Sequence, residues 1–471
     1  MTGNDITERK SARIFNIKLK MRAGFACLLP KNFRICFAGA ALAAKTTRFD
    51  PPPENLFTDF TKRLQFVEKK RMLNVARFFQ NRATFFERLL SVGAAIRVGV
   101  FEKRGMNLTA FVKKNAVLCI ALIAAAITMC FVPPDAEYLE YFDLKTLACL
   151  YGTLAVVCAL RNIFFFRYVA GSIVRVFKNL RAAVLALVYI TLFGSMLIAN
   201  DMALITFLPL GYFVLDSTGN RKSIPFVFIM QNVAANLGGM LTPFGNPQNL
   251  YLYSFYHIGN AEFVKIMAMP FLLSFVLITV CCLFVRPTPL AVGDYISEKP
   301  SPVRTGIYLV LFFLSIAMVF RLLPWEWGIG IITASLVLLD REALWQVDYG
   351  LLLTFCAFFV FSGNMARIDA VRELLGGLVG KNPLLYGILS CQCISNVPSA
   401  VLLSHFTDNY AALLRAVNIG GIGTLISSLA SLITFREYNR CADRKPGRYL
   451  LLFSAINFGL LLILGFACAY L

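Results

Sequence analysis

The sequence predicts an all-α polytopic membrane protein built from two inverted repeats, each with a re-entrant hairpin and interrupted transmembrane helices. The chain of 471 residues is 58% hydrophobic with a mean hydropathy of +0.68. Many of its apolar windows are long enough to cross about 30 Å of hydrocarbon. Four of these windows are interrupted by glycine, proline, asparagine or serine, which is unfavourable for a continuous helix. In lipid, such a break is tolerated where the backbone is buried in protein or lines a water-filled cavity.

The N-terminal region differs from the rest of the chain. Residues 1–105 hold 21 Lys and Arg against 8 Asp and Glu, and their apolar runs, such as 35–44, are too short to span a membrane. The first long span begins just after Met106, so we expect Met106 to be the native start and 1–105 to be a basic extension outside the native protein. A cytoplasmic amphipathic domain is the alternative. The net charge of +20 fits basic cytoplasmic loops better than nucleic-acid binding.

The first repeat is expected over residues 106–285. Its elements are a span after Met106, an acidic turn at 133–143, a span at 144–160, a basic segment at 161–181, an apolar run at 182–215, an interrupted span around 236–250 and a plain span at 267–285. The basic segment is too charged to be an ordinary crossing, so we expect residues 162–178 to form a re-entrant or interfacial hairpin. The positive-inside rule places the N-terminus and 161–181 in the cytoplasm and the acidic turn outside.

The second repeat is expected over residues 305–471, after a proline-rich linker at 286–304. Its elements are spans at 305–322, 326–339 and 350–363, a charged segment at 361–383, a span interrupted at 395–398, a Gly- and Ser-rich span at 417–433 and a last helix at 449–470. A basic loop precedes the last helix, so that loop is predicted to be cytoplasmic and the C-terminus to emerge outside.

Both repeats show the same order of events. An amphipathic segment is followed by a span interrupted by a polar pair, Asn200-Asp201 or Ser395-Asn396, and then by a Gly-rich interrupted span. Paired interruptions of this kind are the best sequence indication of a transporter's binding site near the bilayer midplane. If the halves insert in opposite senses, the two polar tips meet. The ends of the broken helices then offer N–H groups to an anion or carbonyl groups to a cation.

Asp201 is the one acidic residue in the middle of an apolar run. A carboxylate at membrane depth is a functional-site hypothesis by default. It can take either a proton or a sodium ion, because burial favours the neutral form and a bound cation favours the charged one. The sequence offers Asp201 no obvious second acidic partner within the membrane, since Asp348 and Asp369 lie nearer to the ends of spans.

Three short motifs resemble a known family. SNVP at 395–398, AND at 199–201 and TPFGNPQNL at 242–250 are similar to the ion-transporter superfamily of citrate carriers, divalent-anion/sodium symporters and arsenite permeases. The resemblance covers about 106–471. In the symporter branch each hairpin tip carries Ser-Asn-Thr and binds substrate carboxylates and flanking sodium ions. Ser395 and Asn396 match that motif, whereas Val397 replaces its threonine, and the first tip keeps only Asn200.

The motifs and the resemblance together give the expected site residues. The substrate-binding set is Asn200, Ser395, Asn396, Thr242, Pro243 and Asn246. The ion-coupling set is Asp201, Gly238, Gly239, Asn249, Gly420, Gly421, Thr424 and Ser427. No catalytic residue, metal site or cofactor is expected beyond Na⁺ or H⁺ as coupling ion, and the resemblance implies a homodimer.

The expected function is secondary active transport of a small anion, with a di- or tricarboxylate favoured, across a bacterial plasma (inner) membrane and coupled to a Na⁺ or H⁺ gradient. An arsenite or oxyanion exporter and a Na⁺/H⁺ antiporter are the alternatives in the same class, and an ion channel is the alternative in another. The Asn-Asp tip is more similar to the permease and antiporter branches. An enzyme is disfavoured, because His257 and His405 show no ligand spacing and no HExxH motif is present. ATP-driven transport is disfavoured, because no Gly-rich loop carries the Lys-Ser/Thr of a nucleotide site.

Overall fold

The computed structural model describes residues 115–174, 177–289 and 299–470, all of which belong to the unit Arg104–Leu471. The predictions for 1–105, for Met106 and for the middle of the 286–304 linker lie outside the described residues. Within the described part the chain is almost entirely helical, and seven helices are long and apolar enough to cross a membrane. The protein is therefore a polytopic α-helical membrane protein.

The helices of the first half follow the predicted spans closely. They are α5 (Ala116–Phe131), η1 (Ala136–Leu139), α6 (Leu144–Asn162), α7 (Phe165–Val174), α8 (Leu180–Ile198), α9 (Asn200–Ser217), η2 (Arg221–Ser223), α10 (Ile224–Gly238), η3 (Gly239–Leu241), α11 (Pro247–Phe255) and α12 (Asn260–Leu283). Local chemistry explains several boundaries. The side chains of Asp143 and Asn179 accept the N–H groups of Thr146 and Ala182, which caps α6 and α8.

The second half contains the remaining helices. They are α13 (Pro302–Val319), α14 (Trp325–Leu339), α15 (Arg341–Trp345), α16 (Tyr349–Arg367), α17 (Asp369–Lys381), α18 (Pro383–Ile394), α19 (Asn396–Leu403), α20 (Tyr410–Ile419), α21 (Leu429–Tyr438) and α22 (Pro446–Ala469). Proline stands in the first turn of several of these helices, where its missing N–H leaves no hydrogen bond unmade.

Each of the two amphipathic segments contains a short helix. Among the described residues of 162–178 this is α7, and the segment at 361–383 contains the end of α16 followed by α17. The helix pairs α8–α9 and α18–α19 are each broken at one residue and pack on each other as helical hairpins.

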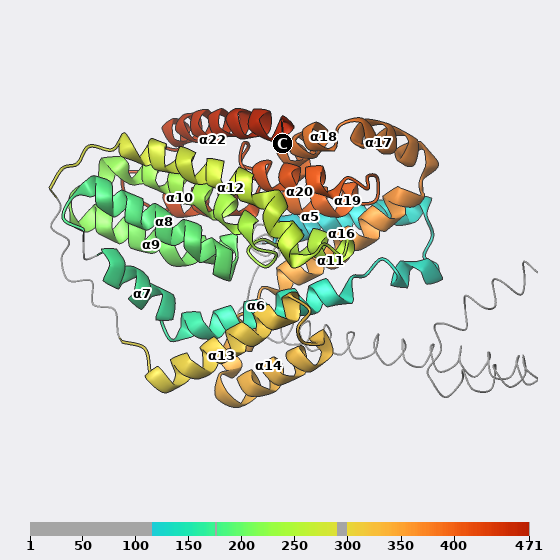
Figure 1. Ribbon diagram of the computed structural model, residues 1–471, viewed down its shortest axis with the longest axis horizontal. Helices are drawn as coiled ribbons and strands as arrows, with labels where there is room; N and C mark the ends of the chain where they lie inside the picture. Colours follow the sequence, from blue (N-terminus) through green and yellow to red (C-terminus); the bar gives the residue numbers. More distant parts are fainter. Residues whose placement is uncertain (1–114, 175–176, 290–298, 471) are drawn as a thin grey trace, which may run out of the picture. The chain divides into compact units, whose positions relative to one another are not determined.

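The helices pack as two groups. We call α5, α6 and α13–α16 the support group, and α8–α12 with α18–α22 the bundle group; α6 packs on α13, α14 and α15, whereas α10 packs on α8, α9 and α21. Figure 1 shows α6, α13 and α14 running together, apart from α8, α9, α10 and α12. Contacts of α11 with α6 and of α19 with α16 join the groups.

The ends of α12 show that the two hairpins open in opposite directions. With 24 residues, α12 extends for about 36 Å. The open end of α8–α9 lies at its C-terminal end, where Leu180 N–H donates to Thr288 O (2.8 Å) and Arg181 Nε donates to Val285 O (2.7 Å). The open end of α18–α19 lies at the other end, where Tyr256 after α11 donates its hydroxyl to Ser404 O (2.9 Å).

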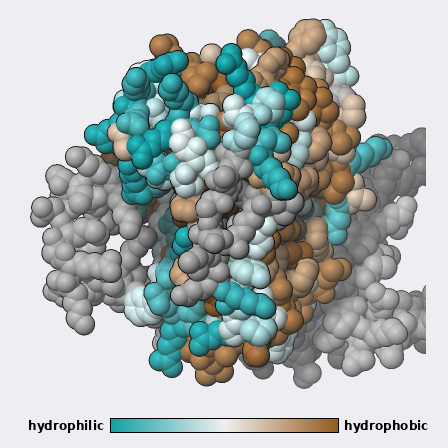
Figure 2. Space-filling model, turned by 90° about the vertical axis from the view of Figure 1, so that its left-hand side faces the viewer, coloured by the Kyte–Doolittle hydropathy of each residue, from teal (hydrophilic) through white to brown (hydrophobic). Residues whose placement is uncertain are grey.

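One end of the molecule is polar. Figure 2 looks onto the side where α7 lies and α8 begins, and it shows hydrophilic residues over much of this face with hydrophobic residues along its right side. At the opposite end, Arg367 of α16 pairs with Asp135 (2.5 Å) in the turn after α5. The hydrogen bond from Arg367 holds the pKa of Asp135 below its ordinary value of 3.8, so this pair stays ionised at any pH above that value.

Candidate functional site

The first tip is a one-residue break between α8 and α9. Ala199 has a φ of 64°, a left-handed conformation that is uncommon for a residue with a side chain. α9 starts directly afterwards at Asn200, whose Oδ1 accepts the N–H of Asp201 at 2.9 Å. The Nδ2 of the same side chain donates to Asn236 Oδ1 of α10 at 3.4 Å. The tip therefore exposes the start of a helix and is attached to the neighbouring interrupted span.

The second tip repeats this geometry. Ser395 has a φ of 75°, α19 starts at Asn396, and Asn396 Oδ1 accepts the N–H of Val397 at 2.9 Å. The backbone N–H of Asn396 donates to Ser427 O at 2.9 Å, which attaches this tip to the loop before α21. Each tip is therefore bonded to the interrupted span that follows it in its own half. Asn200 bonds to Asn236, 36 residues later, and Asn396 bonds to Ser427, 31 residues later.

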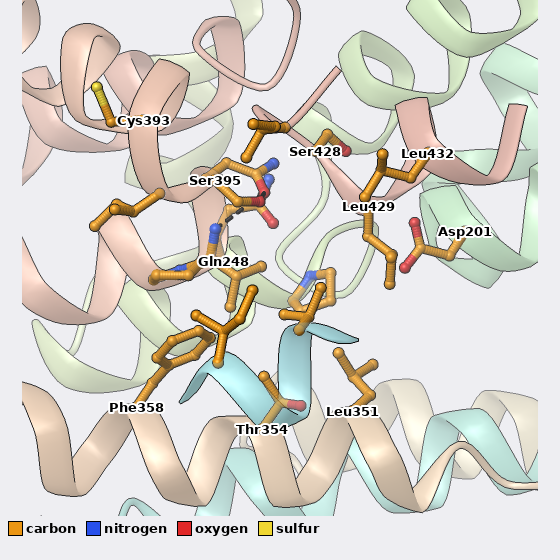
Figure 3. Close-up of a pocket in the computed structure, with 18 of the residues that line it drawn as sticks. Asp201, Gln248, Leu351, Thr354, Phe358, Cys393, Ser395, Ser428, Leu429 and Leu432 are labelled. Atoms are coloured by element: carbon orange, nitrogen blue, oxygen red, sulfur yellow. Dashed lines mark hydrogen bonds between the residues drawn. The ribbon is translucent and has the colours of Figure 1, made fainter. Parts of the chain in front are cut away.

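Both tips line one cavity of about 260 Å³ (Figure 3). Its polar residues come mainly from the two tips and from the starts of α11 and α21, whereas α5 and α16 close it with side chains that are apolar apart from Thr354. The polar lining consists of Asn200, Asp201, Gln248, Thr354, Ser395, Asn396 and Ser428. In Figure 3, Asp201 lies beside Leu429, on the opposite side of the pocket from Cys393 and Ser395.

The first turns of four helices converge on this cavity. α9 contributes Asn200 and Asp201, α11 contributes Pro247 and Gln248, α19 contributes Asn396 to Pro398, and α21 contributes Leu429 with its cap Ser428. Each helix start carries unsatisfied N–H groups and about half a positive charge. Among the described lining residues there is no Lys or Arg, so no basic side chain adds positive charge to the lining.

A buried network of amide side chains joins the two interrupted spans. Asn246 Nδ2 donates to Asn418 Oδ1 at 3.2 Å, and Asn418 Nδ2 donates to Asn249 Oδ1 at 2.6 Å. Asn249 also donates to Gly239 O at 3.1 Å, so it supports the unwound segment between α10 and α11. These bonds fix the loop of one half against α20 of the other, because buried amides with unmade bonds would be costly.

Gly421 lies close to side chains of both halves. A Cβ atom at this position would stand 3.0 Å from Asn396 Nδ2 and 3.4 Å from Asn236 Oδ1. The absence of a side chain thus lets the asparagine of the second tip approach the asparagine that holds the first.

The second unwound loop is supported by a side chain from the hairpin. Gln392 of α18 donates from Nε2 to Gly420 O (2.9 Å) and Ile422 O (3.2 Å), and its Oε1 accepts the N–H of Thr424 at 2.9 Å. One side chain therefore satisfies three backbone groups of the loop between α20 and α21.

The expected substrate-binding residues fall into two places. Asn200, Ser395 and Asn396 line the cavity. Thr242, Pro243 and Asn246 lie behind it in the first unwound loop, where Thr242 Oγ1 donates to Met196 O at 2.7 Å. Of the expected ion-coupling residues, Asp201 lines the cavity. The others, which do not line it, are Gly238, Gly239, Asn249, Gly420, Gly421, Thr424 and Ser427.

Sequence reasoning missed several residues of the site. Gln248 and Ser428 line the cavity at the starts of α11 and α21. The sequence did show the two breaks beside them, because Gln248 lies in the run at 242–250 and Ser428 lies in the Gly- and Ser-rich span at 417–433. The sequence shows no second acid within the membrane spans, yet the structure brings one from a span end close to Asp201. Asp348 lies at the start of α16, near a span end as expected, but it lines a second small cavity together with Asp201. No sequence signal brings these two positions together, because they belong to different helix groups.

Other chemistries find little support in the described residues. Among them no group of three His, Cys, Asp or Glu side chains could hold a metal ion. His405 does not line the tip cavity; its ring meets Phe255 edge to face at 5.3 Å, and it faces a separate cavity with His257.

Comparison with known proteins agrees with this architecture. Residues 100–418 match the citrate transporter family. An uncharacterized transporter of Methanocaldococcus jannaschii is 33% identical over 317 residues, which cover 67% of this chain and 86% of that protein. The inner membrane protein YbiR of Escherichia coli is 30% identical over 329 residues, which cover 68% of this chain and 87% of that protein. An uncharacterized transporter of Mycobacterium tuberculosis is 27% identical over 272 residues, which cover 52% of this chain and 61% of that protein.

The family and two of these three relatives are described as transporters, which agrees with the expectation of a protein that is not an enzyme. The match extends from the first span to α20 and so includes both tips and the first unwound loop. The chain is a multi-pass membrane transporter and belongs to the citrate transporter family.

Proposed function

We propose that this protein is a secondary active transporter that moves a small anion, a di- or tricarboxylate, across the plasma membrane of a bacterium with a Na⁺ or H⁺ gradient. The observation that carries this proposal is the convergence of four helix starts on the tip cavity without any Lys or Arg in its described lining. Helix starts favour negative charge. An anion with two or three separated carboxylates can use several of them at once.

The neutral side chains of the cavity suit a carboxylate that must also leave. Asn200, Asn396, Ser395 and Gln248 offer donors without a fixed positive charge. A permanent ion pair with Arg or Lys would bind the substrate more strongly but would also slow its release. Thr242, Pro243 and Asn246 are assigned to the support of this substrate site.

Coupling is assigned to the residues around the two unwound loops. Asp201 and the loop residues Gly238, Gly239, Asn249, Gly420, Gly421, Thr424 and Ser427 hold the coupling ion in this proposal. Unwound backbone exposes carbonyl oxygens, which are suitable ligands for Na⁺, and Asp201 adds a carboxylate beside the substrate cavity.

The fold supports a proposal of two inverted repeats, over 106–285 and 305–471, joined by the linker 286–304. The hairpins α8–α9 and α18–α19 open at opposite ends of α12, and both tips line one cavity. α18 and α19 have 12 and 8 residues, too few to cross about 30 Å, which favours a re-entrant hairpin. α8 has 19 residues and is long enough to cross the membrane. We infer that α8–α9 is also re-entrant because its tip lines the same cavity as the tip of α18–α19.

We propose that transport moves the bundle group against the support group, and that two copies dimerise through the support group. The tip cavity lies between the groups, since α5 and α16 face the tips across it. A relative movement would therefore change which side of the membrane the cavity reaches. The basic segment 1–105 is assigned no part in this cycle.

A Na⁺/H⁺ antiporter is the second candidate, and one observation favours it. Asp201 and Asp348 line one small cavity, and antiporters need acidic residues that exchange cations. An oxyanion exporter and a channel have no comparable support in the geometry.

The test is uptake of radiolabelled citrate and succinate into proteoliposomes made with protein that starts at Met106. It is run with an inward Na⁺ gradient, with an inward H⁺ gradient and with neither. Gradient-dependent accumulation of either acid supports the proposal and identifies the coupling ion. Uptake that equilibrates without accumulating, whatever the gradient, indicates a channel. Cation exchange without movement of either acid indicates the antiporter.

A further inference from the structure

A second cavity of about 70 Å³ lies beside the tip cavity, between the first tip, α6 and the start of α16. The two cavities share Asp201, Pro247, Leu351 and Leu429. Asp201 therefore stands between them, with one cavity on each side.

Three polar side chains face this small cavity, among mostly apolar neighbours. Asp201 Oδ1 is buried and has no hydrogen-bond partner. Thr153 of α6 is 7% exposed, and its Oγ1 is likewise buried without a partner. Asp348 is the third, and its Oδ1 accepts the N–H of Leu351 at 3.1 Å as the cap of α16. Of the ten buried side-chain polar atoms without a partner in the described residues, these two face the same cavity, so one ligand in it could satisfy both.

We propose that Asp201, Thr153 and Asp348 form a binding site for a small monovalent cation, Na⁺ or H⁺, which bridges the bundle group and the support group. This inference rests on the proposed ion-coupled transport and deepens it. It adds two residues from the support group to an ion site that would otherwise belong to the bundle group alone.

The charge balance of the cavity favours a cation. Two carboxyl groups face it, and none of its lining residues is Lys, Arg or His. A carboxylate in surroundings of low polarity is unfavourable without a counter-charge. A bound cation supplies that charge and also gives Asp201 Oδ1 and Thr153 Oγ1 the partner that they lack. The volume of about 70 Å³ is large enough for a small ion or for one or two waters.

The exposures of the two acids define a route. Asp348 is exposed, whereas the free oxygen of Asp201 is buried. Asp348 lies at the end of the molecule where α6 finishes, near Arg161, whose guanidinium donates to Gln346 at 2.9 Å. A cation can thus pass from solvent at this end, past Asp348 and Thr153, to Asp201 at the substrate cavity. Because Asp201 and Asp348 belong to different groups, a relative movement of the groups would open the site and release the cation.

The first experiment measures thermal unfolding of the purified full-length protein in detergent, a readout that requires no transport. In one arm Na⁺ replaces choline at fixed pH and ionic strength, and in the other the pH is lowered in choline. A ligand that binds only the folded state raises Tm. We expect one arm to raise the Tm of the wild type and to leave that of Asp348→Asn nearly unchanged. Asparagine caps a helix about as well as aspartate, so this variant keeps the cap of α16.

Matched variants separate the site from general effects of charge. Asp340→Asn is the control, because Asp340 also caps a helix at this end of α6 but does not line the cavity. Its response to cations should equal that of the wild type. Asp348→Glu should restore the response, Thr153→Val should weaken it, and Thr153→Ser should preserve it.

The second experiment measures citrate uptake into proteoliposomes. The cation concentration for half-maximal uptake should rise about tenfold or more in Asp348→Asn, which corresponds to about 1.4 kcal/mol. Equal cation responses of Asp348→Asn and the wild type in both experiments overturn the inference, even where citrate uptake is intact. A thermal response that is lost in Asp348→Asn, in a protein that moves no carboxylate, supports the cation site and overturns the proposed substrate instead.

Discussion

At the scale of single residues, the site depends on close approach between the two halves. A methyl group at Gly421 would stand 3.0 Å from Asn396 Nδ2 and 3.4 Å from Asn236 Oδ1, so the side chain of Asn396 would have to shift slightly. Both asparagines are buried, and the side-chain oxygen of Asn396 also accepts the N–H of Val397, which restricts such a shift. The position therefore controls the geometry of the tip rather than the chemistry of the substrate.

We predict that Gly421→Ala reduces citrate uptake by more than tenfold. The added Cβ would stand 3.0 Å from Asn396 Nδ2, so the side chain of Asn396 in the second tip must shift by a few tenths of an ångström within the cavity lining. Uptake into proteoliposomes measures the loss, and the amount of folded protein is checked by size-exclusion chromatography. Gly377→Ala is the matched control, because a Cβ at Gly377 meets no atom within 4 Å. Normal uptake by Gly421→Ala would contradict the role assigned to this approach.

The residues that the sequence predicted are those that mark breaks. Asn200, Ser395 and Asn396 stand out because polar residues interrupt apolar spans, and all three line the cavity. Asp348 and Thr153 carry no such mark, since an acidic residue before a helix is a common cap and a threonine in an apolar helix is ordinary. Their importance arises from packing between α6, α16 and the first tip, which a single sequence does not encode in any short pattern.

At the scale of elements, each unwound loop is held by one amide side chain. Asn249 supports the first loop from α11, which follows it, and Gln392 supports the second from α18, which precedes it. The breaks themselves were predictable from glycine and proline. Their support was not, because Gln392 lies 28 residues from the carbonyl of Gly420 and in a different helix. Polar residues beside each tip marked its place, but the one-residue break itself, at Ala199 or Ser395, has no glycine to indicate it.

We predict that Gln392→Met destabilises the second loop and reduces transport. The substitution keeps the approximate volume but leaves Gly420 O, Ile422 O and the N–H of Thr424 without these partners. Each buried group left without a partner costs about 1–3 kcal/mol, so a clear fall in Tm is expected. The control is Gln346→Met, because Gln346 bonds to the side chains of Arg161 and Glu342 and to no loop carbonyl. Equal falls in Tm for the two variants would contradict a specific support by Gln392.

At the scale of the whole molecule, the arrangement of the two helix groups suggests how one cavity can serve both sides of a membrane. Figure 1 shows α6, α13 and α14 of the support group apart from most of the bundle group. Several contacts cross between the groups through aromatic rings. Phe244 in the first unwound loop meets Phe320 after α13 at 5.7 Å, and Tyr251 of α11 meets Phe359 of α16 at 5.6 Å. Apolar contacts of this kind can slide without leaving a hydrogen bond unmade.

We predict that linking the groups covalently stops transport, whereas linking helices within the bundle group does not. In a background without native cysteines, Phe244→Cys and Phe320→Cys are joined by a bifunctional thiol reagent that spans the gap. Tyr256→Cys and Tyr410→Cys are the matched pair, because their rings are 5.4 Å apart and both belong to the bundle group. Citrate uptake is measured before and after linking. Linking should lower uptake more than tenfold in the first pair only. When the reagent attaches through disulfide bonds, a reductant that cleaves them should restore uptake. Unchanged uptake in a fully linked first pair would mean that the two groups do not move past each other, and the substrate would then have to cross by local opening of the tips.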